Sequence, residues 1–358
     1  MTQVILMKAL VLSGGKGTRL RPLTFTLAKQ LIPLANKPIL GYVLDQIAAA
    51  GITQIGVIIA PETGYYVKEY LKDGSAWGID VTFISQEPLG LAHAVKTARN
   101  FLGKDNFIMC LGDNLQGQGL TTYIHKFKKE KMDALILLKP VEDPTKFGVA
   151  TLDEKANIIE LVEKPKDPSS NLAIVGTYIF SKKIFKAVDQ IKPSMRGELE
   201  ITDAIQKMIN MGFNVKAETL KTWWIDTGKK DDILIANAKI LDEYIKSDIK
   251  GIVQESKIEG RVTIKEKTKV FNSTIRGPSA IGVNCIIENS FIGPYTSVGN
   301  GTKIVDSAIE YSVILENVQI TGVDKLEESL IGRNAKVARN HRKGCLKLHV
   351  GDYSEVET

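Results

Sequence analysis

The chain has 358 residues, of which 44% are hydrophobic and 25% are charged, and its formal net charge at pH 7 is +6. This length allows two domains with buried cores, and the composition is typical of an ordinary soluble protein. The mild positive charge suits anionic substrates. The sequence contains no block dense in lysine and arginine, so nucleic-acid binding is not predicted.

Three widely separated cysteines, Cys110, Cys285 and Cys345, form neither a disulfide framework nor a zinc-binding pattern, and they predict a reducing compartment. The apolar N-terminal stretch has no basic segment and no small-residue cleavage site, so we interpret it as the first strand rather than a signal peptide. No apolar run approaches the ~20 residues that a membrane span requires. We expect a cytoplasmic protein that binds neither membranes nor nucleic acid.

The first predicted strand, residues 9–12, leads into three glycines, Gly14, Gly15 and Gly17. Glycine lets the backbone approach a ligand closely and adopt positive φ, and successive amides that point inward form a nest for anions. Positive charge is added by the basic residues that follow, which are Lys16, Arg19, Arg21 and Lys29. The segment therefore predicts a polyphosphate-binding loop.

Two common phosphate-binding loops do not fit this segment. The P-loop requires Ser or Thr after its lysine, where Gly17 follows Lys16, and the dinucleotide-binding loop requires a third glycine where Leu20 stands. The string Gly-Gly-Lys-Gly-Thr-Arg-Leu-Arg-Pro-Leu-Thr at 14–24, followed by Lys-Gln-Leu-Ile-Pro at 29–33, instead resembles the signature of sugar-1-phosphate nucleotidylyltransferases. Its second part is most similar to the long type of glucose-1-phosphate thymidylyltransferase.

Helices and strands alternate after this loop. Helices are predicted over 38–51, 65–71 and 91–101, and strands over 55–60, 81–85 and 107–111. The alternation indicates an α/β fold with a Rossmann-like, mostly parallel, doubly wound sheet. Ligands of such sheets bind beyond the carboxyl ends of the strands. The glycine loop, residues 86–90 and Asp113 all follow strand ends, so we expect one cleft to hold them.

The pattern changes from about residue 139. Short strands predicted over 135–138, 149–152, 158–163 and 173–180 suggest a smaller sugar-binding lobe. Helices predicted over 198–211 and 231–245 then complete a nucleotidyltransferase domain that spans residues 1–248.

Beyond residue 251, apolar residues recur at intervals of five or six. They are Ile275, Ile281, Ile286, Ile292, Val298, Ile304, Ile309, Ile314 and Ile320. A six-residue period is typical of a parallel β-helix, and the segment resembles the left-handed β-helix of the long thymidylyltransferases. We predict this β-helix over 249–340 and a polar tail over 341–358, with short antiparallel strands as the alternative. The exposed faces of such a solenoid favour assembly into a homo-oligomer.

The family resemblance implies transfer of dTMP from dTTP to glucose-1-phosphate, giving dTDP-glucose and pyrophosphate. Two anions must meet in this reaction, so the site needs cations and a metal more than a base. By resemblance, Arg19 and Lys29 bind the triphosphate, Asp113 and Asp226 hold Mg²⁺, and Lys164 binds the sugar phosphate. Two separated carboxylates are sufficient for Mg²⁺, which also binds phosphate oxygens and water.

The resemblance also implies binding residues. Those for the nucleotide are Leu12, Gly14, Gly15, Gly17, Thr18, Gln30, Gln86 and Gly90, and those for the sugar are Asn114, Gly148, Glu163 and Val175. Gln86 would pair with a pyrimidine edge, but Leu89 and a shortened segment depart from many short thymidylyltransferases and leave thymine and uracil as alternatives. Position 147 is Phe where those enzymes often have Tyr. We expect His93 to have a packing or surface role and Trp224 to support Asp226.

Three other functions are compatible with the fold class. An enzyme of the same fold that uses UTP or GTP, or another sugar-1-phosphate, stays an alternative. An added acetyltransferase activity is disfavoured, because its usual general base is histidine and the chain's four histidines, His93, His125, His341 and His349, all lie outside the repeats. A regulatory subunit that only binds sugar nucleotides is disfavoured because the phosphate-binding cations and both metal-binding carboxylates are present.

Overall fold

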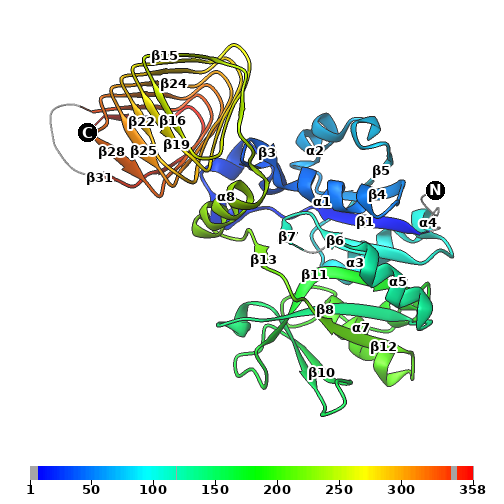
Figure 1. Cartoon of the computed structure of the whole chain (residues 1–358). Helices are drawn as coiled ribbons and strands as arrows, with labels where there is room; N and C mark the ends of the chain where they lie inside the picture. Colours follow the sequence, from blue (N-terminus) through cyan, green and yellow to red (C-terminus); the bar gives the residue numbers. More distant parts are fainter. Residues whose placement is uncertain (1–6, 118, 340–344, 358) are drawn as a thin grey trace. The chain divides into compact units, whose positions relative to one another are not determined.

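The structure is a computed structural model that describes residues 7–117, 119–339 and 345–357 (Figure 1). The chain forms two compact units, one of Met1–Lys16 with Leu40–Asp226 and one of Gly17–Ile39 with Thr227–Thr358. The predicted domain boundary at residue 248 lies within the second unit. Helix α8 (Lys230–Tyr244) precedes that boundary, yet its Asn237 side chain donates a hydrogen bond of 3.0 Å to the Tyr295 carbonyl of the β-helix.

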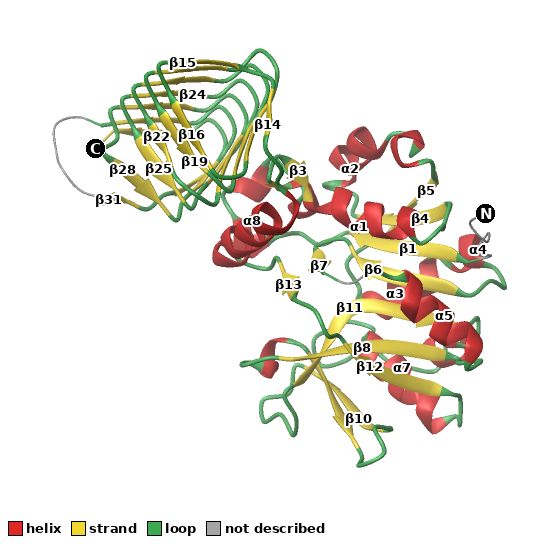
Figure 2. Ribbon diagram, in the orientation of Figure 1, coloured by secondary structure: helices red, strands yellow, loops and turns green. Residues whose placement is uncertain are grey.

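The first unit contains a nine-stranded mixed sheet (Figure 2). Its strands are β1 (Lys8–Ser13), β4 (Gln54–Ile59), β5 (Asp80–Ser85), β6 (Phe107–Leu111), β8 (Ala134–Pro140), β9 (Gly148–Leu152), β10 (Ile158–Glu163), β11 (Leu172–Phe180) and β12 (Val215–Thr219). Strands β6, β1, β4 and β5 are neighbours in that order and run parallel. They form the Rossmann-like part of the sheet, so the predicted fold class is confirmed.

The strands after residue 134 join this same sheet. Strand β11 runs antiparallel to β6 and to β8, and β9 and β10 extend the sheet at one edge. The region predicted as a smaller sugar-binding lobe is therefore continuous with the nucleotide-binding half. It looked separate in the sequence because β9, β10 and β11 are antiparallel strands that follow one another with no helix between them.

Most helices of the first unit were predicted, including α1, whose first residue belongs to the second unit. The helices are α1 (Ile39–Ala49), α2 (Gly64–Leu71), α3 (Leu91–Thr97), α4 (Arg99–Leu102), α5 (Thr121–Lys129), α6 (Ile184–Val188) and α7 (Ile201–Asn210). The single helix predicted over 91–101 is interrupted at Ala98. The sequence analysis did not predict α5, α6 or β12.

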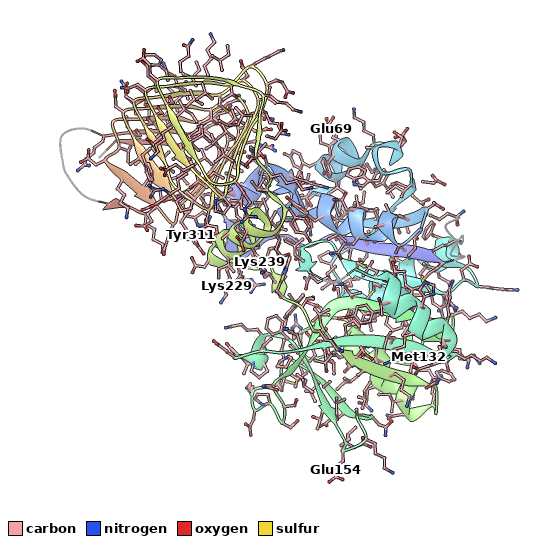
Figure 3. The ribbon with its side chains drawn as sticks, viewed as in Figure 1. Glu69, Met132, Glu154, Lys229, Lys239 and Tyr311 are labelled. Carbon is pink, nitrogen blue, oxygen red and sulfur yellow. The ribbon has the colours of Figure 1, made fainter. Side chains whose placement is uncertain are left out.

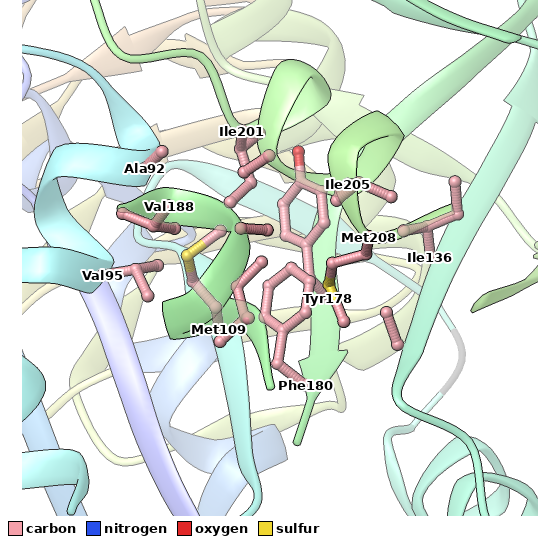
Figure 4. Close-up of a cluster of buried hydrophobic side chains, with 14 of the residues drawn as sticks. Ala92, Val95, Met109, Ile136, Tyr178, Phe180, Val188, Ile201, Ile205 and Met208 are labelled. Carbon is pink, nitrogen blue, oxygen red and sulfur yellow. The ribbon is translucent and has the colours of Figure 1, made fainter. Parts of the chain in front are cut away.

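One apolar core joins the sheet to α3, α6 and α7 (Figure 4). Helix α7 contributes a buried stripe with helical spacing, which includes Ile201, Ile205 and Met208. On strand β11 the rings of Tyr178 and Phe180 stack with their centroids 5.9 Å apart. This packing fixes the strands whose ends carry the candidate site.

A small second sheet pairs β7 (Asn114–Gln116) with β13 (Trp224–Asp226) in antiparallel register. Asn114 lies opposite Asp226 in this pairing. The ladder therefore places Asp226 beside the segment that directly follows β6.

The second unit contains a parallel β-helix with three stacked sheets (Figure 1). The first sheet consists of β14 (Asp248–Ile249), β17 (Val262–Ile264), β20 (Ser279–Ile281), β23 (Thr296–Val298), β26 (Val313–Ile314), β29 (Leu330–Ile331) and β32 (His349–Val350). The second consists of β15 (Ile252–Gln254), β18 (Lys269–Phe271), β21 (Ile286–Glu288), β24 (Lys303–Val305), β27 (Gln319–Thr321), β30 (Lys336–Ala338) and β33 (Glu355–Glu357). The third consists of β16 (Lys257–Glu259), β19 (Thr274–Arg276), β22 (Phe291–Ile292), β25 (Ala308–Glu310), β28 (Lys325–Glu327) and β31 (Cys345–Leu346). A separate hairpin of β2 (Pro33–Leu34) and β3 (Lys37–Pro38) is not part of these three sheets.

The repeat that predicted a left-handed β-helix corresponds to its buried ladders. Ile275, Ile292 and Ile309 pair in register on successive coils and are fully buried. The repeat predicts that each of its apolar residues points into the β-helix, and one of these positions is wrong. Ile286 is 42% exposed, and the adjacent Ile287 is buried instead and pairs with Ile304. Neighbours on a strand point to opposite faces, so a shift of one residue exchanges inside for outside.

The stack continues further than predicted. Strands β31, β32 and β33 pair with β28, β29 and β30, so part of the segment predicted as a polar tail extends the β-helix. Residues 340–344 and 358 lie outside the described residues. Across the ranges that are described, no helix combines the length and the apolarity that a membrane crossing needs.

Candidate active site

Two of the predicted metal ligands converge on one amide. The Asn114 side chain donates hydrogen bonds from Nδ2 to Oδ1 of Asp113, at 3.0 Å, and to Oδ1 of Asp226, at 3.4 Å. Asp113 follows strand β6, whereas Asp226 ends β13, so the β7–β13 ladder brings together carboxylates that are far apart in the sequence.

Trp224 fixes the orientation of this amide. Its indole Nε1 donates a hydrogen bond of 2.8 Å to Oδ1 of Asn114, which directs Nδ2 toward the two carboxylates. The indole in turn packs edge to face with Phe147, with the ring centroids 5.1 Å apart. The expected supporting role of Trp224 therefore acts through Asn114.

Gly176 is a site residue that the sequence analysis missed. A Cβ atom at this position would lie 2.9 Å from Cγ of Asn114 and 2.7 Å from Cγ of Leu111. Only glycine leaves room for the Asn114 side chain beside strand β11. The Ile-Val-Gly-Thr-Tyr string offered a signal, because a glycine inside a strand often marks a close approach.

Gln86 and Gly90 lie together at the end of strand β5. The Gln86 side chain donates from Nε2 to the Gly90 carbonyl at 3.1 Å and lies 3.0 Å from Nδ1 of His93. Burial, and secondarily Lys96, lowers the pKa of His93, which favours the neutral imidazole that can accept this hydrogen bond. His93 thus positions Gln86, a role that the sequence analysis did not assign.

Gly90 also meets a steric demand. Its φ is +104°, and a Cβ atom there would lie 2.4 Å from the Leu199 carbonyl oxygen. Leu199 bonds to the chain on both sides of Gly90, through the Leu89 carbonyl and the Ala92 amide. The segment that precedes α7 thereby fixes the loop that carries Gln86.

Gly148, Glu163 and Lys164 form a second group in the first unit. Gly148 and Glu163 pair across β9 and β10, and a Cβ atom at Gly148 would lie 3.1 Å from Oε2 of Glu163. Lys164 has a left-handed backbone, with φ of 45°, and its amide bonds to the Phe147 carbonyl at 2.9 Å. Its Nζ atom is 3.9 Å from Oε1 of Glu163 and its side chain is 43% exposed, so it can reach an anionic ligand.

Arg196 links Glu163 to the loop before α7. Its Nη1 atom lies 3.4 Å from Oε1 of Glu163 and 3.3 Å from Oε1 of Glu200. Burial, followed by the charge of Glu200, raises the pKa of Glu163. Arg196 contacts one oxygen of the Glu163 carboxylate, and the Thr202 hydroxyl donates to the other. These contacts hold the carboxylate in place to accept hydrogen bonds from the hydroxyl groups of a ligand.

The predicted phosphate-binding loop begins at the end of β1. Leu12 is buried and its carbonyl accepts a hydrogen bond from the Gly112 amide at 2.9 Å, which ties β1 to the Asp113 loop. The Ser13 hydroxyl is buried and has no hydrogen-bond partner among the described residues. Gly14 and Gly15 follow, and Lys16 lies 3.2 Å from Oε1 of Glu62. The unpartnered Ser13 hydroxyl is a candidate ligand group that the sequence analysis missed.

The second unit carries the rest of the phosphate-binding string. Gly17 has φ of +62°, and a Cβ atom there would lie 3.0 Å from Cγ2 of Thr24 and 3.1 Å from Cβ of Lys29. The Thr24 hydroxyl donates to the Gly17 carbonyl at 2.7 Å. The exposed residues Thr18 and Arg19 follow in a single 3₁₀ turn, Thr18–Leu20.

Arg19 and Lys29 share an acidic neighbour. Both cations act on Asp232 near the start of α8, where burial raises the pKa of that carboxyl and the charges of Lys229, Lys29 and Arg19 oppose the rise. Gln30 is almost fully buried, and its Oε1 has no hydrogen-bond partner among the described residues. Leaving such an oxygen unpaired costs about 1–3 kcal/mol, so Gln30 suits a position where a ligand supplies the donor.

Ten of the predicted residues fall into four groups. Within the first unit these are Asp113 with Asn114 and Asp226, Gln86 with Gly90, and Gly148 with Glu163 and Lys164. Within the second unit the charges of Arg19 and Lys29 both act on Asp232. Val175 is fully buried in β11, so its side chain is part of the core rather than of an open surface.

The donor set fits magnesium better than a softer metal. Across the described parts of the chain, no group of three or more His, Cys, Asp or Glu side chains could hold a metal ion. Asp113 and Asp226, joined through the Asn114 amide, would offer carboxylate oxygens to a metal, and these are the ligands that Mg²⁺ prefers.

The chain matches the profile described as nucleotidyl transferase over residues 8–243. It is 46% identical over 355 residues to a glucose-1-phosphate thymidylyltransferase from Streptomyces antibioticus, covering 98% of this chain and 99% of the relative. The chain belongs to the nucleotidyl transferase family. A second family member with the same name, from Streptomyces griseus, is 43% identical over 98% of this chain and 99% of its own length.

The structure also resembles solved members of this family. A Bacillus anthracis protein assigned as a glucose-1-phosphate thymidylyltransferase, solved with sucrose bound, superposes with a TM-score of 0.62 at 35% identity. The superposition covers 65% of this chain and 94% of that protein.

Proposed function

We propose that the protein transfers dTMP from dTTP to glucose-1-phosphate, with release of pyrophosphate. The observation that carries this proposal is the near full-length identity to two enzymes of that name, joined to the convergence of Asp113 and Asp226 on Asn114. The phosphate-binding string and the hydroxyl-binding group around Glu163 supply the parts that the reaction requires.

The proposed step is a displacement at the α-phosphorus of the nucleotide. An oxygen of the sugar phosphate forms a bond to this phosphorus as the bond to the α–β bridging oxygen breaks, and the bridging oxygen leaves with pyrophosphate. Catalysis of this kind rests on positioning and charge stabilisation. Arg19 and Lys29 bind the triphosphate and stabilise the charge of the leaving group, while Lys164 binds the phosphate of the sugar.

Mg²⁺ is the proposed cofactor, and Asp113 and Asp226 are the residues that would hold it. When bound, it neutralises charge on the phosphate oxygens. Asn114 and Trp224 keep the two carboxylates in position. The sugar hydroxyls are bound by Glu163 and Asn114, and Gly148 leaves room beside Glu163.

Gln86 is proposed to read the base. Its Nε2 is already engaged by Gly90 and His93, so Oε1 is the atom that can accept a hydrogen bond from a base. Thymine and uracil carry an N3–H donor at that edge, whereas cytosine has an acceptor there. This chemistry favours a thymine or uracil nucleotide, and the identities above favour thymine.

We also propose a cytoplasmic homo-oligomer. Support for a reducing compartment comes from Cys110 and Cys285, which are free buried thiols, and burial raises the pKa of Cys110 to about 12. Support for self-association comes from the second sheet of the β-helix, which exposes the apolar side chains of Ile252, Phe271 and Ile286.

The proposal is tested by measuring pyrophosphate release from dTTP in the presence of glucose-1-phosphate and Mg²⁺. We expect Asp226→Asn to abolish turnover while the protein keeps its thermal unfolding midpoint. The matched control is Glu154→Gln, a carboxyl-to-amide change at the turn between β9 and β10 (Figure 3), which should leave the rate unchanged. Near-normal activity of Asp226→Asn would exclude the proposed metal site.

A further inference from the structure

The segment that carries Arg19 and Lys29 belongs to the compact unit of the β-helix rather than to the unit of the nine-stranded sheet. We call residues 17–32 the binding segment, and the structure describes all of them. Its regular structure consists of three single 3₁₀ turns, Thr18–Leu20, Leu23–Phe25 and Lys29–Leu31. Hydrogen-bond geometry in 3₁₀ turns is poor, so contacts with other elements are needed to fix the conformation of this segment.

The last coil of the β-helix, defined here as residues 345–357, contacts the binding segment directly. The Thr26 hydroxyl donates a hydrogen bond of 2.7 Å to Oδ2 of Asp352. Gly351 packs against Pro22, and a Cβ atom added to this glycine would lie 3.0 Å from Cβ of the proline. Pro22 and Thr26 flank the middle 3₁₀ turn. The last coil therefore contacts the binding segment between the turn of Arg19 and the turn of Lys29.

The carboxylate of Asp352 is itself held in place. Its Oδ1 accepts a hydrogen bond of 2.7 Å from the Arg333 amide of the preceding coil. Strands β32 and β33, which lie on either side of Asp352, pair with β29 and β30 of that coil. A hydrogen bond to a charged acceptor is stronger than one to a neutral group. Asp352 therefore offers Thr26 an oriented and charged acceptor.

A second set of contacts attaches the chain just after the binding segment to the β-helix. The Asn36 side chain donates from Nδ2 to the Val298 carbonyl at 2.9 Å. The Ala35 amide donates to Oδ1 of the fully buried Asn237 at 2.8 Å, and Asn237 donates to the Tyr295 carbonyl. The binding segment is thus attached at two places, one in the last coil and one nearer the middle of the β-helix.

We propose that the last coil of the β-helix holds Arg19 and Lys29 in the conformation that binds the triphosphate, with Asp352 as the positioning residue. Loss of the Asp352 contact lets the middle turn move, so a smaller fraction of the protein has both cations in place. A nucleotide that needs both then binds with an apparent affinity reduced by that fraction. What the two cations bind rests on the proposed function, whereas the attachment of the segment does not.

Hydrogen–deuterium exchange of the full chain without nucleotide measures the attachment directly. Amides of all three turns donate hydrogen bonds within the binding segment, so their exchange rates report its opening. We expect Asp352→Ala to raise exchange over residues 18–31 about tenfold, because a hydrogen bond to a charged group is lost. Exchange in α1 should not change. The thermal unfolding midpoint should stay close to that of wild type.

Variants of Thr26 separate this contact from a general effect of the last coil. Thr26→Val removes the hydroxyl and should raise exchange as Asp352→Ala does, and combining the two changes should add little, because both remove the same bond. Thr26→Ser keeps the hydroxyl and should exchange like wild type. The matched control is Asp324→Ala, because the Asp324 carboxylate pairs with Arg339 of the β-helix at 2.6 Å. This control should leave exchange over residues 18–31 unchanged.

Kinetics test the consequence for the nucleotide. In Asp352→Ala, KM for dTTP should rise about twofold or more. KM for glucose-1-phosphate should stay the same, because Lys164, the proposed ligand of the sugar phosphate, lies in the first unit. A purely structural role of Asp352 would change both KM values together.

Each outcome decides one part of the proposal. Unchanged exchange over residues 18–31 in Asp352→Ala and Thr26→Val would overturn the attachment, and so would an equal increase in Asp324→Ala. Increased exchange with an unchanged KM for dTTP would overturn the positioning role. Exchange needs no turnover, so a wild-type protein that releases no pyrophosphate from dTTP would contradict the proposed function while the exchange result still decides the attachment.

Discussion

Replacing Trp224 with phenylalanine removes one hydrogen bond and keeps an aromatic ring against Phe147. In the native protein the indole N–H donates to Asn114 at 2.8 Å, and Asn114 in turn contacts both Asp113 and Asp226. Without that donor the amide can rotate, and the two carboxylates lose their shared partner. The cost of one such hydrogen bond is about 1–1.5 kcal/mol, which corresponds to about a tenfold change in rate.

We therefore expect Trp224→Phe to lower kcat/KM for the proposed reaction about tenfold and to raise the Mg²⁺ concentration that gives half-maximal activity. The assay is pyrophosphate release over a Mg²⁺ titration. Trp77→Phe is the control, because Trp77 also donates its indole N–H to a carboxylate, Oδ1 of Asp45 at 3.1 Å, on the exposed surface. An unchanged Mg²⁺ dependence in Trp224→Phe would refute the positioning role of Trp224.

Three further predictions concern local structure. Gly17→Ala should lower the free energy of unfolding by about 1–3 kcal/mol, measured by urea denaturation. The loss should exceed that of Gly51→Ala, because both positions have positive φ but only Gly17 is crowded. Equal losses would contradict the steric argument. In the same assay, Ile287→Ala should lower the free energy of unfolding by about 2–5 kcal/mol, and Ile286→Ala should lower it by less than about 0.5 kcal/mol. The reverse order would show that the inward positions are misassigned. Burial lowers the pKa of His93, so the stability that its neutral ring contributes is present above its ordinary pKa and is lost as the pH falls through the lowered value. KM for dTTP should rise over the same pH range. His93→Gln should remove that rise.

The sequence predicted the buried parallel strands and the β-helix, because runs and periods of apolar residues have a direct structural meaning. The parallel strands β1, β4 and β6 read as continuous apolar runs because they are buried on both faces. The β-helix was visible in its five- and six-residue spacing, but adjacent isoleucines at 286 and 287 offered two inward positions. The choice between them depends on strand register, which spacing alone does not determine.

The candidate site was predicted as a set of residue types rather than as an arrangement. Asp113 and Asp226 follow from their family strings, but the amide of Asn114 that joins them depends on the pairing of β7 with β13, which are 110 residues apart. Lys347 lay in a segment predicted to be a polar tail. Its place in the β-helix follows only from the extra strands that complete the stack.

The most direct test of the proposed function is pyrophosphate release with glucose-1-phosphate and Mg²⁺, measured separately with dTTP, UTP, GTP, ATP and CTP. We expect dTTP to give the highest kcat/KM and UTP to follow, because both bases offer the N3–H donor that Gln86 can accept. Equal or better use of GTP, ATP or CTP would contradict the role of Gln86. Failure to release pyrophosphate from any of the five nucleotides, with glucose-1-phosphate or with other sugar-1-phosphates, would contradict the proposed activity itself.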